Sequence, residues 1–165
     1  MIRLNRILVP TDFGEAADAA LAYGRELARN FGGHIEVLHV ADNVFSRAVG
    51  IEGYMATYPE IQHDVEESAR ARLAQLLSDE DRVVLGAKAI IRTSNSPALE
   101  IVKYASDTNV DLIIMGTHGR GPMAHLLMGS VAERVVRTAP CPVLTVRHPE
   151  HEFVLPDALV AVAKA

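Results

Sequence analysis

The chain has 165 residues, of which 49% are hydrophobic and 22% are charged, and its formal net charge is −5. This length suits one domain that buries about two thirds of its unfolded surface, and the acidic balance argues against a nucleic-acid partner. Because the single Cys141 cannot form an internal disulfide, and neither a signal peptide nor a membrane-spanning run is recognisable, we expect a cytoplasmic protein without membrane contact.

The start of the chain predicts a strand followed by a helix. Residues 6–9 form a short β-rich run that Pro10 closes, because proline cannot donate to a sheet ladder. Asp12 and Glu15 have the spacing of a capping box. Apolar residues then recur at helical intervals until Gly32, which ends the predicted helix.

A second strand is predicted next, followed by a long segment without clear periodicity. Residues 34–40 form a β-rich run, whereas residues 41–59 match neither period. A segment of that length indicates a surface excursion, to which we assign no role. Apolar residues at helical spacing then predict a second helix, with a stripe that consists of Ile61, Val65, Ala69, Leu73 and Leu76. Residues 86–92 predict a third strand.

The second half of the chain repeats the alternation. Ser96 and Pro97 fit the N-cap and first position of a third helix, which Asn109 ends. Residues 111–115 are nearly all apolar, as in a central strand covered on both faces. Two more elements are predicted, a fourth helix at residues 130–138 and a fifth strand at residues 142–147. This alternation implies an α/β fold, in which helices cover both faces of a parallel sheet.

A glycine-rich loop separates the fourth strand from the fourth helix. Gly116 and Gly119 are followed by nine residues and then by Gly129 and Ser130. Such a loop lets backbone N–H groups converge on an anion, because glycine permits close approach and a helix N-terminus offers unpaired donors. The spacing matches neither the dinucleotide fingerprint nor a Walker loop. Ser130 and Glu133 also have capping-box spacing, but the upstream glycines favour phosphate binding.

The run from Gly116 to Ser130 resembles the Gly-x2-Gly-x9-Gly-Ser motif of ATP-binding universal stress proteins. Three other blocks look like the same family: ILVPTD at residues 7–12, LLMGSVAERV at residues 126–135 and PCPVL at residues 140–144. The resemblance covers roughly residues 2–147 and implies a nucleotide-binding domain at residues 1–147, followed by a C-terminal tail at residues 148–165. It also implies a Rossmann-like, five-stranded parallel sheet of order 3-2-1-4-5, similar to the adenine nucleotide alpha hydrolases.

By the same resemblance the chain binds ATP with Mg²⁺, the metal being held mainly by phosphate oxygens. Ligands of such sheets bind beyond the carboxyl ends of the strands, where the winding reverses, which would bring Asp12 beside Met115. Val40 would offer backbone groups to the adenine edge, although Val40 and Met115 also fit a plain strand core. The residues that the resemblance implies for the nucleotide are Pro10, Thr11, Asp12, Val40, Met115, Gly116, His118, Gly119, Arg120, Gly129, Ser130 and Val131.

Other interpretations of these residues stay open at this point. Asp12 fits a cap of the first helix as well as a nucleoside contact, and its two carboxylate oxygens can serve both roles. His118 is interpreted as a loop residue near the phosphates. It lies seven positions from His125 in an irregular loop, and no cysteine or paired carboxylate completes a ligand set, so we expect no protein metal site. Cys141, between two prolines, is interpreted as a small buried apolar residue.

The function that we expect is a nucleotide-dependent regulatory or stress-response module with an unidentified protein partner. An alternative is an ATP hydrolase or nucleotidyl-transferring enzyme. Phosphoryl transfer needs cationic clamps and a group that orients the nucleophile, whereas this loop offers Arg120 alone as a cation. We therefore expect no catalytic residues and at most slow ATP hydrolysis. A stress or chaperone-like protein that works without ATP is a third possibility.

The fifth strand predicts how the protein assembles. In the order 3-2-1-4-5 it lies at a sheet edge, where the apolar residues Val143, Leu144 and Val146 would be unsafe in water. We expect residues 142–147 to pair with the same strand of a second molecule in a homodimer, as similar universal stress proteins commonly do. The alternative cover is the tail from Phe153 onward, folded back on its own chain.

Overall fold

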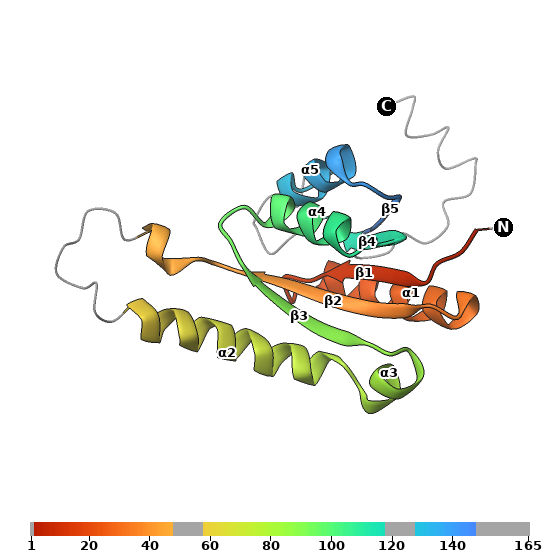
Figure 1. Cartoon of the computed structure of the whole chain (residues 1–165), viewed down its shortest axis with the longest axis horizontal. Helices are drawn as coiled ribbons and strands as arrows, with labels where there is room; N and C mark the ends of the chain where they lie inside the picture. Colours follow the sequence, from red (N-terminus) through yellow and green to blue (C-terminus); the bar gives the residue numbers. More distant parts are fainter. Residues whose placement is uncertain (1, 48–57, 118–127, 148–165) are drawn as a thin grey trace, which may run out of the picture.

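The computed structural model describes residues 2–47, 58–117 and 128–147. Its five strands form one parallel sheet of order β3-β2-β1-β4-β5, which confirms the expected fold and strand order (Figure 1). The strands are β1 (Arg6–Pro10), β2 (His34–Ala41), β3 (Lys88–Thr93), β4 (Leu112–Gly116) and β5 (Val143–Val146). The helices are α1 (Glu15–Phe31), the 3-10 turn η1 (Val44–Arg47), α2 (Tyr58–Leu76), α3 (Asp79–Val84), α4 (Pro97–Asp107) and α5 (Ser130–Thr138).

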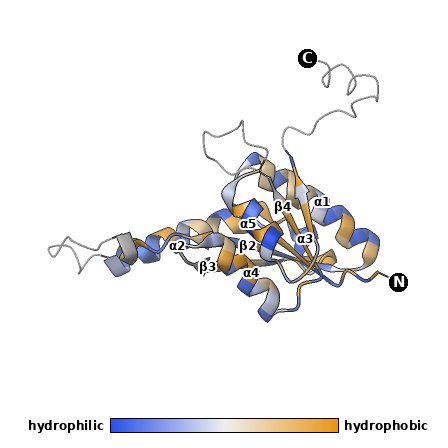
Figure 2. Ribbon diagram, turned by 90° about the horizontal axis from the view of Figure 1, so that it is seen from above, coloured by the Kyte–Doolittle hydropathy of each residue, from blue (hydrophilic) through white to orange (hydrophobic). Residues whose placement is uncertain are grey.

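Helices cover both faces of the sheet because its central strands, β1 and β4, are buried and apolar on both faces. Successive side chains of a strand point to opposite faces, so that Ile7 and Val9 pack with α1 and α2, while Leu8 packs with α4 and α5. Figure 1 shows α4 and α5 on one side of the strands and α2 on the other. Figure 2 shows the hydrophobic strand β4 enclosed between helices. Neighbouring parallel strands therefore share one buried layer on each face.

Helix α1 begins later than its predicted capping box. Its N-cap is Gly14, and no side chain caps it within the described residues. Asp12 instead accepts a hydrogen bond at Oδ1 from the Gly14 N–H, 3.0 Å away. The capping-box prediction is wrong because the chain first turns through Phe13, whose φ is +63°. The helix ends as predicted, at Gly32 in the left-handed conformation with φ +67°.

Helix α2 buries the predicted stripe except at its first residue. Ala69 and Leu73 are buried as expected, but Ile61 is 45% exposed and its neighbour Gln62 is 8% exposed. Gln62 is buried because its amide is used: Oε1 accepts from the Val44 N–H at 3.0 Å and Nε2 donates to Glu66 at 3.0 Å. Polar contacts to the chain after β2 therefore decide which side of the N-terminal half of α2 faces inward.

Two further segments differ from the sequence interpretation. The predicted excursion at residues 41–59 is shorter, since β2 includes Ala41, η1 follows, and α2 starts at Tyr58; its residues 48–57 and the tail at residues 148–165 lie outside the described residues. Helix α3 was not predicted, and it is fastened by a capping box between Ser78 and Asp81. Within the described parts, no helix is both long enough and apolar enough to span a membrane.

Candidate functional site

The segments after β1 and β4 lie side by side at the carboxyl edge of the sheet. Leu8 pairs with Ile113, and continuing this register by two residues brings Pro10 level with Met115. On the other side of β1, Pro10 pairs with Leu38. Beyond that pair the Thr11 N–H still donates to the Leu38 carbonyl, so the residue before Asp12 lies against β2 near Val40. The strand order thus places four residues from three separated parts of the chain, Pro10, Asp12, Val40 and Met115, at one edge.

The turn between β1 and α1 is held by its own hydrogen bonds. Thr11 is buried, and its N–H donates to the Leu38 carbonyl at 2.8 Å, which continues the ladder between β1 and β2. The Thr11 hydroxyl oxygen accepts from the Phe13 N–H at 2.9 Å, and Asp12 holds the Gly14 N–H. The half-buried Asp12 carboxylate is therefore anchored through one oxygen at the start of α1.

Close packing against Ala16 explains why residue 116 is a glycine, and the spacing of the motif does not show this. A Cβ at this position would lie 2.7 Å from Ala16 Cβ, 2.8 Å from Ala16 C and 2.9 Å from Ala16 O. The first turn of α1 consequently rests against the backbone at the end of β4. A glycine is required here for close packing of α1 on β4, whether or not a ligand is also present.

The start of α5 is attached directly to the end of β4. The Thr117 N–H donates to the Val146 carbonyl at 2.8 Å, and the Gly129 N–H donates to the Thr117 carbonyl at 2.7 Å. Gly129 is the N-cap, since the Glu133 N–H donates to its carbonyl at 2.9 Å. Ser130 is the first helical residue and is exposed, so the interpretation of Ser130 as a cap paired with Glu133 is wrong.

The N-terminus of α5 has the properties of an anion-binding helix end. Among the described residues no side chain caps it. The N–H groups of Ser130, Val131 and Ala132 belong to the first turn and have no acceptor within the helix. Together with the helix dipole, such groups favour a negative charge. Gly129 has φ −73° and ψ 155°, a conformation open to any residue, so the backbone itself does not require glycine there.

The remaining residues predicted to bind the nucleotide either belong to the core or lie outside the described residues. Met115 is 5% exposed and belongs to the core under α4 and α5, against which the half-buried Val40 and Val131 pack. These three side chains thus serve the core, as the plain interpretation expects for Val40 and Met115. His118, Gly119 and Arg120 lie outside the described residues, as does His125.

Sequence reasoning missed a stack of side chains between helix α2 and the β1–α1 turn. The guanidinium carbon of Arg72 lies 4.0 Å from the ring centroid of Phe13, and the Phe13 and His39 ring centroids are 4.5 Å apart. These residues border a groove of about 410 Å³ between α2 and the turn. Nothing in the spacing along the chain connects Phe13, His39 and Arg72, because only the packing of α2 on the sheet brings them together.

The described residues contain no group of three or more His, Cys, Asp or Glu side chains that could hold a metal ion. The one described cysteine, Cys141, is half-buried next to the core under α4 and α5. Burial raises the pKa of its thiol, which keeps it protonated and poorly nucleophilic near neutral pH. The described groups at the carboxyl edge that can contact a ligand are the backbone donors at the start of α5 and the Asp12 carboxylate.

Comparison with known proteins identifies the family. The sequence profile of the universal stress protein family matches residues 3–147. The chain belongs to the universal stress protein family. Universal stress protein MJ0577 of Methanocaldococcus jannaschii is 32% identical over 157 residues, which cover 88% of this chain and 96% of that protein. The solved structure of MJ0577 superposes on 91% of this chain and 100% of its own, with a TM-score of 0.77.

Two more distant structures share the fold of this universal stress protein. One is a universal stress protein in complex with cAMP, which is 20% identical and has a TM-score of 0.59 over 86% of this chain and 96% of that chain. The other is the universal stress protein of Archaeoglobus fulgidus in complex with dAMP. It is also 20% identical, with a TM-score of 0.59 over 88% of this chain and 99% of that chain. At this identity the likeness shows the common fold alone.

Proposed function

We propose that this universal stress protein binds ATP with Mg²⁺ at the carboxyl edge of the sheet and acts as a nucleotide-dependent regulatory module. The observation that carries the proposal is the start of α5. Its N-cap, Gly129, is fixed by a 2.7 Å hydrogen bond to Thr117 at the end of β4, and no described side chain takes the donors of its first turn. A phosphate group is the ligand that this arrangement suits best.

The nucleotide would lie across the edge with its two halves on different elements. The nucleoside half would contact the segment from Pro10 to Asp12, together with Val40 and Met115. The phosphates would lie at the start of α5, against Gly129, Ser130 and Val131, with the motif residues Gly116, His118, Gly119 and Arg120 beside them. This assignment follows the family motif, and the adjacency of β1, β2 and β4 supports it. Residues 1–147 would form the nucleotide-binding unit.

Two relatives support adenine nucleotides as the ligand class, since the distant family members described above were determined with cAMP and dAMP. Magnesium would be held chiefly by phosphate oxygens. When bound, the metal would neutralise part of the phosphate charge. The protein's own share is to hold the phosphates with the N–H donors of α5 and the nucleoside through the Thr11–Asp12 segment.

Binding would serve regulation, because the sequence motif supplies phosphate donors without a recognisable residue that orients a nucleophile. Nucleotide binding would then stabilise whichever conformation holds ATP better and so change the affinity for a protein partner. We expect ATP hydrolysis far below the ordinary enzyme range of about 1 to 1,000 per second. Sustained turnover within that range, by protein freed of contaminating ATPases, would instead identify an enzyme.

We propose further that the protein is a homodimer joined through β5. This strand is the sheet edge next to β4, and Leu144 on it is 36% exposed. Pairing of two such edges across a two-fold axis would satisfy both sets of backbone groups with one self-complementary contact. Light scattering on the full-length protein at micromolar concentration should give twice the chain mass, and a monomer would contradict this assembly.

The nucleotide proposal is tested at Gly129. Its φ of −73° allows any side chain, so Gly129→Val should fold while its side chain blocks phosphate approach. Thr138→Val, at the other end of α5, is the matched control. In calorimetric titrations with ATP and Mg²⁺ we expect at least a tenfold weaker affinity for Gly129→Val, about 1.4 kcal/mol, and an unchanged affinity for Thr138→Val. Wild-type affinity in a folded Gly129→Val protein would contradict the placement of the phosphates.

A further inference from the structure

The turn after β1 contains a bulky residue in an unfavourable backbone conformation. Phe13 has φ +63°, and it is one of two non-glycine residues with positive φ in the described part of the chain. Left-handed backbone is common for asparagine, which is the other residue, but is an outlier for a large aromatic side chain. Such a conformation persists only where surrounding contacts over-determine it. The contacts of Phe13 therefore identify what holds this turn.

Two side chains hold the Phe13 ring from elsewhere in the fold. Arg72 of α2 places its guanidinium carbon 4.0 Å from the ring centroid, within the range of a cation–π contact. His39 of β2 lies on the ring at 4.5 Å between centroids, with an angle of 39° between the planes. The ring is thus fixed by one residue from the helix and one from the sheet.

The stack is connected directly to the segment that precedes Phe13. His39 Nδ1 lies 2.8 Å from the Thr11 carbonyl oxygen, and because that oxygen can only accept, Nδ1 carries the proton. The Thr11 hydroxyl in turn accepts from the Phe13 N–H. Asp12 lies between these two anchored residues, and its own carboxylate holds Gly14. A change in the stack therefore shifts the backbone on both sides of Asp12.

Helix α2 is itself fastened to the ends of two strands, which sets the reach of Arg72. The Thr93 hydroxyl at the end of β3 donates to Glu66 at 2.7 Å, and Gln62 binds the chain after β2 through the Asp42 carbonyl at 3.3 Å. The hydrogen bond from Thr93 lowers the pKa of the Glu66 carboxyl, so this anchor stays charged at neutral pH. Arg72 consequently projects from a fixed support.

We propose that Arg72 is a positioning residue for the nucleotide: through Phe13 and His39 it sets the Thr11–Asp12 segment in the geometry that receives the nucleoside half. This inference rests on the proposed function and adds to it a contribution from α2, a helix without any of the expected nucleotide-binding residues. Arg72 is exposed on the groove beside the turn. Its replacement therefore leaves the core intact, and variants should fold.

The test compares two arginines on the same helix. Arg72→Met keeps an unbranched stem but loses the charge over Phe13, whereas Arg70→Met removes an exposed arginine whose guanidinium pairs with Glu67 at 2.9 Å. Affinities are measured for ATP, for AMP and, by competition, for inorganic tripolyphosphate. We expect Arg72→Met to weaken ATP and AMP by the same factor, about two- to fivefold for an exposed cation–π contact, and to leave tripolyphosphate unchanged. Arg72→Lys, which keeps the cation, should retain most of the affinity.

Two further measurements separate positioning from general damage. In a Phe13→Leu background the additional change Arg72→Met should have no further effect, because both changes break the same stack. Amide resonances of residues 11–14 should shift in Arg72→Met without nucleotide, and stay in place in Arg70→Met.

Each other result overturns the inference in a distinguishable way. A wild-type protein that binds neither ATP nor AMP refutes the proposed function, and the inference with it. If the wild type binds both and Arg72→Met binds them equally well, the inference alone is wrong. An equal loss for tripolyphosphate, or an equal loss in Arg70→Met, would show a general disturbance of the fold in place of positioning of the nucleoside segment.

Discussion

Replacing Gly116 by alanine tests whether the contact between α1 and β4 is as close as the structure shows. The added Cβ would meet three atoms of Ala16 at 2.7 to 2.9 Å, whereas carbon atoms in contact normally lie about 3.5–4.0 Å apart. Two of those atoms are backbone, so no side-chain rotation relieves the overlap. The first turn of α1 must move away from β4 by up to about 1 Å.

The size of the effect follows from the cost of overpacking. Inserting a methyl group into a well-packed core costs about 1–3 kcal/mol, and the backbone contacts of Gly116 place it near the upper end. We expect Gly116→Ala to lower the free energy of unfolding by about 2–3 kcal/mol. For a domain of this size, that corresponds to a fall in Tm of about 5–10 °C. Movement of α1 should also disturb the Asp12–Gly14 turn and weaken ATP binding.

Two other glycines supply the controls, measured by urea unfolding and by Tm. A Cβ at Gly24, inside α1, would lie 2.9 Å from Cγ2 of the buried Val9, a side-chain methyl group in place of the backbone atoms that Gly116 meets. Because alanine also favours the helix by about 1 kcal/mol, Gly24→Ala should cost clearly less than Gly116→Ala. A Cβ at Gly32 has nothing within 4 Å but requires φ +67°, so Gly32→Ala should cost about 1–2 kcal/mol. A Gly116→Ala protein as stable as Gly24→Ala would refute the reasoning.

Three more residues have expected outcomes. Asp81→Asn should lower the free energy of unfolding by about 3 kcal/mol, because Arg25 binds the buried Asp81 carboxylate at 2.7 Å. Hydrogen bonding from Arg25 lowers the pKa of Asp81. The difference in unfolding free energy between the wild type and Asp81→Asn, measured by urea melts, should therefore be full above about pH 4 and vanish as the pH falls through the folded-state pKa. A difference that does not depend on pH would argue against this. Tyr104→Phe should cost about 1–3 kcal/mol in the same assay, because the Tyr104 hydroxyl donates to the buried Glu36 at 3.0 Å, and an unchanged stability would rule this out. Burial raises the pKa of Tyr104 to about 12, so one of the four tyrosines should ionise near pH 12 in an absorbance titration. Alkylation of Cys141 at pH 7.5 should be at least about tenfold slower in the folded than in the urea-unfolded protein, and equal rates would show an accessible thiol.

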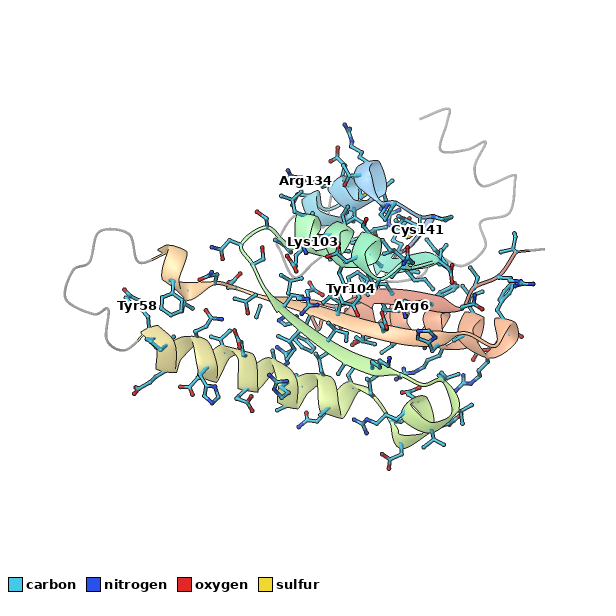
Figure 3. The ribbon with its side chains drawn as sticks, viewed as in Figure 1. Arg6, Tyr58, Lys103, Tyr104, Arg134 and Cys141 are labelled. Atoms are coloured by element: carbon cyan, nitrogen blue, oxygen red, sulfur yellow. The ribbon has the colours of Figure 1, made fainter. Side chains whose placement is uncertain are left out.

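Tyr104 belongs to a polar cluster under α4 that the sequence did not indicate. Tyr104 and Arg6 lie near each other between α4 and the strands (Figure 3), and both reach Glu36, Arg6 by an ion pair of 3.6 Å. Glu36 is 3% exposed in the middle of an apolar strand pattern. Its partners come from 30 residues before and 68 residues after it, so no local pattern links them.

Local physics allowed much of the fold to be predicted from the sequence. Strand and helix positions follow from the period of apolar residues, and the stops at Gly32 and after Pro10 follow from backbone conformation and a missing donor. The helix start at Ser96 and Pro97 was also placed correctly. Each of these signals acts within one element, so the tertiary environment does not alter it. The motif from Gly116 to Ser130 likewise identified the family.

Tertiary structure decided where the helices begin and which of their faces are buried. The true N-caps are Gly14 and Gly129, because a cap depends on the path by which the chain enters the helix. The inward face of α2 was decided by hydrogen bonds of Gln62 to a distant segment.

The two findings with most bearing on the site were beyond the reach of sequence reasoning. Gly116 must be glycine because Ala16 lies against it, and Arg72 reaches the turn that holds Asp12 because α2 packs across the sheet. The sequence by itself determined the order of elements apart from the short helix α3, since periodicity and turn chemistry are local. The tertiary structure decided which residues meet at the carboxyl edge, since those contacts join segments tens of residues apart whose approach depends on how helices pack on the strands.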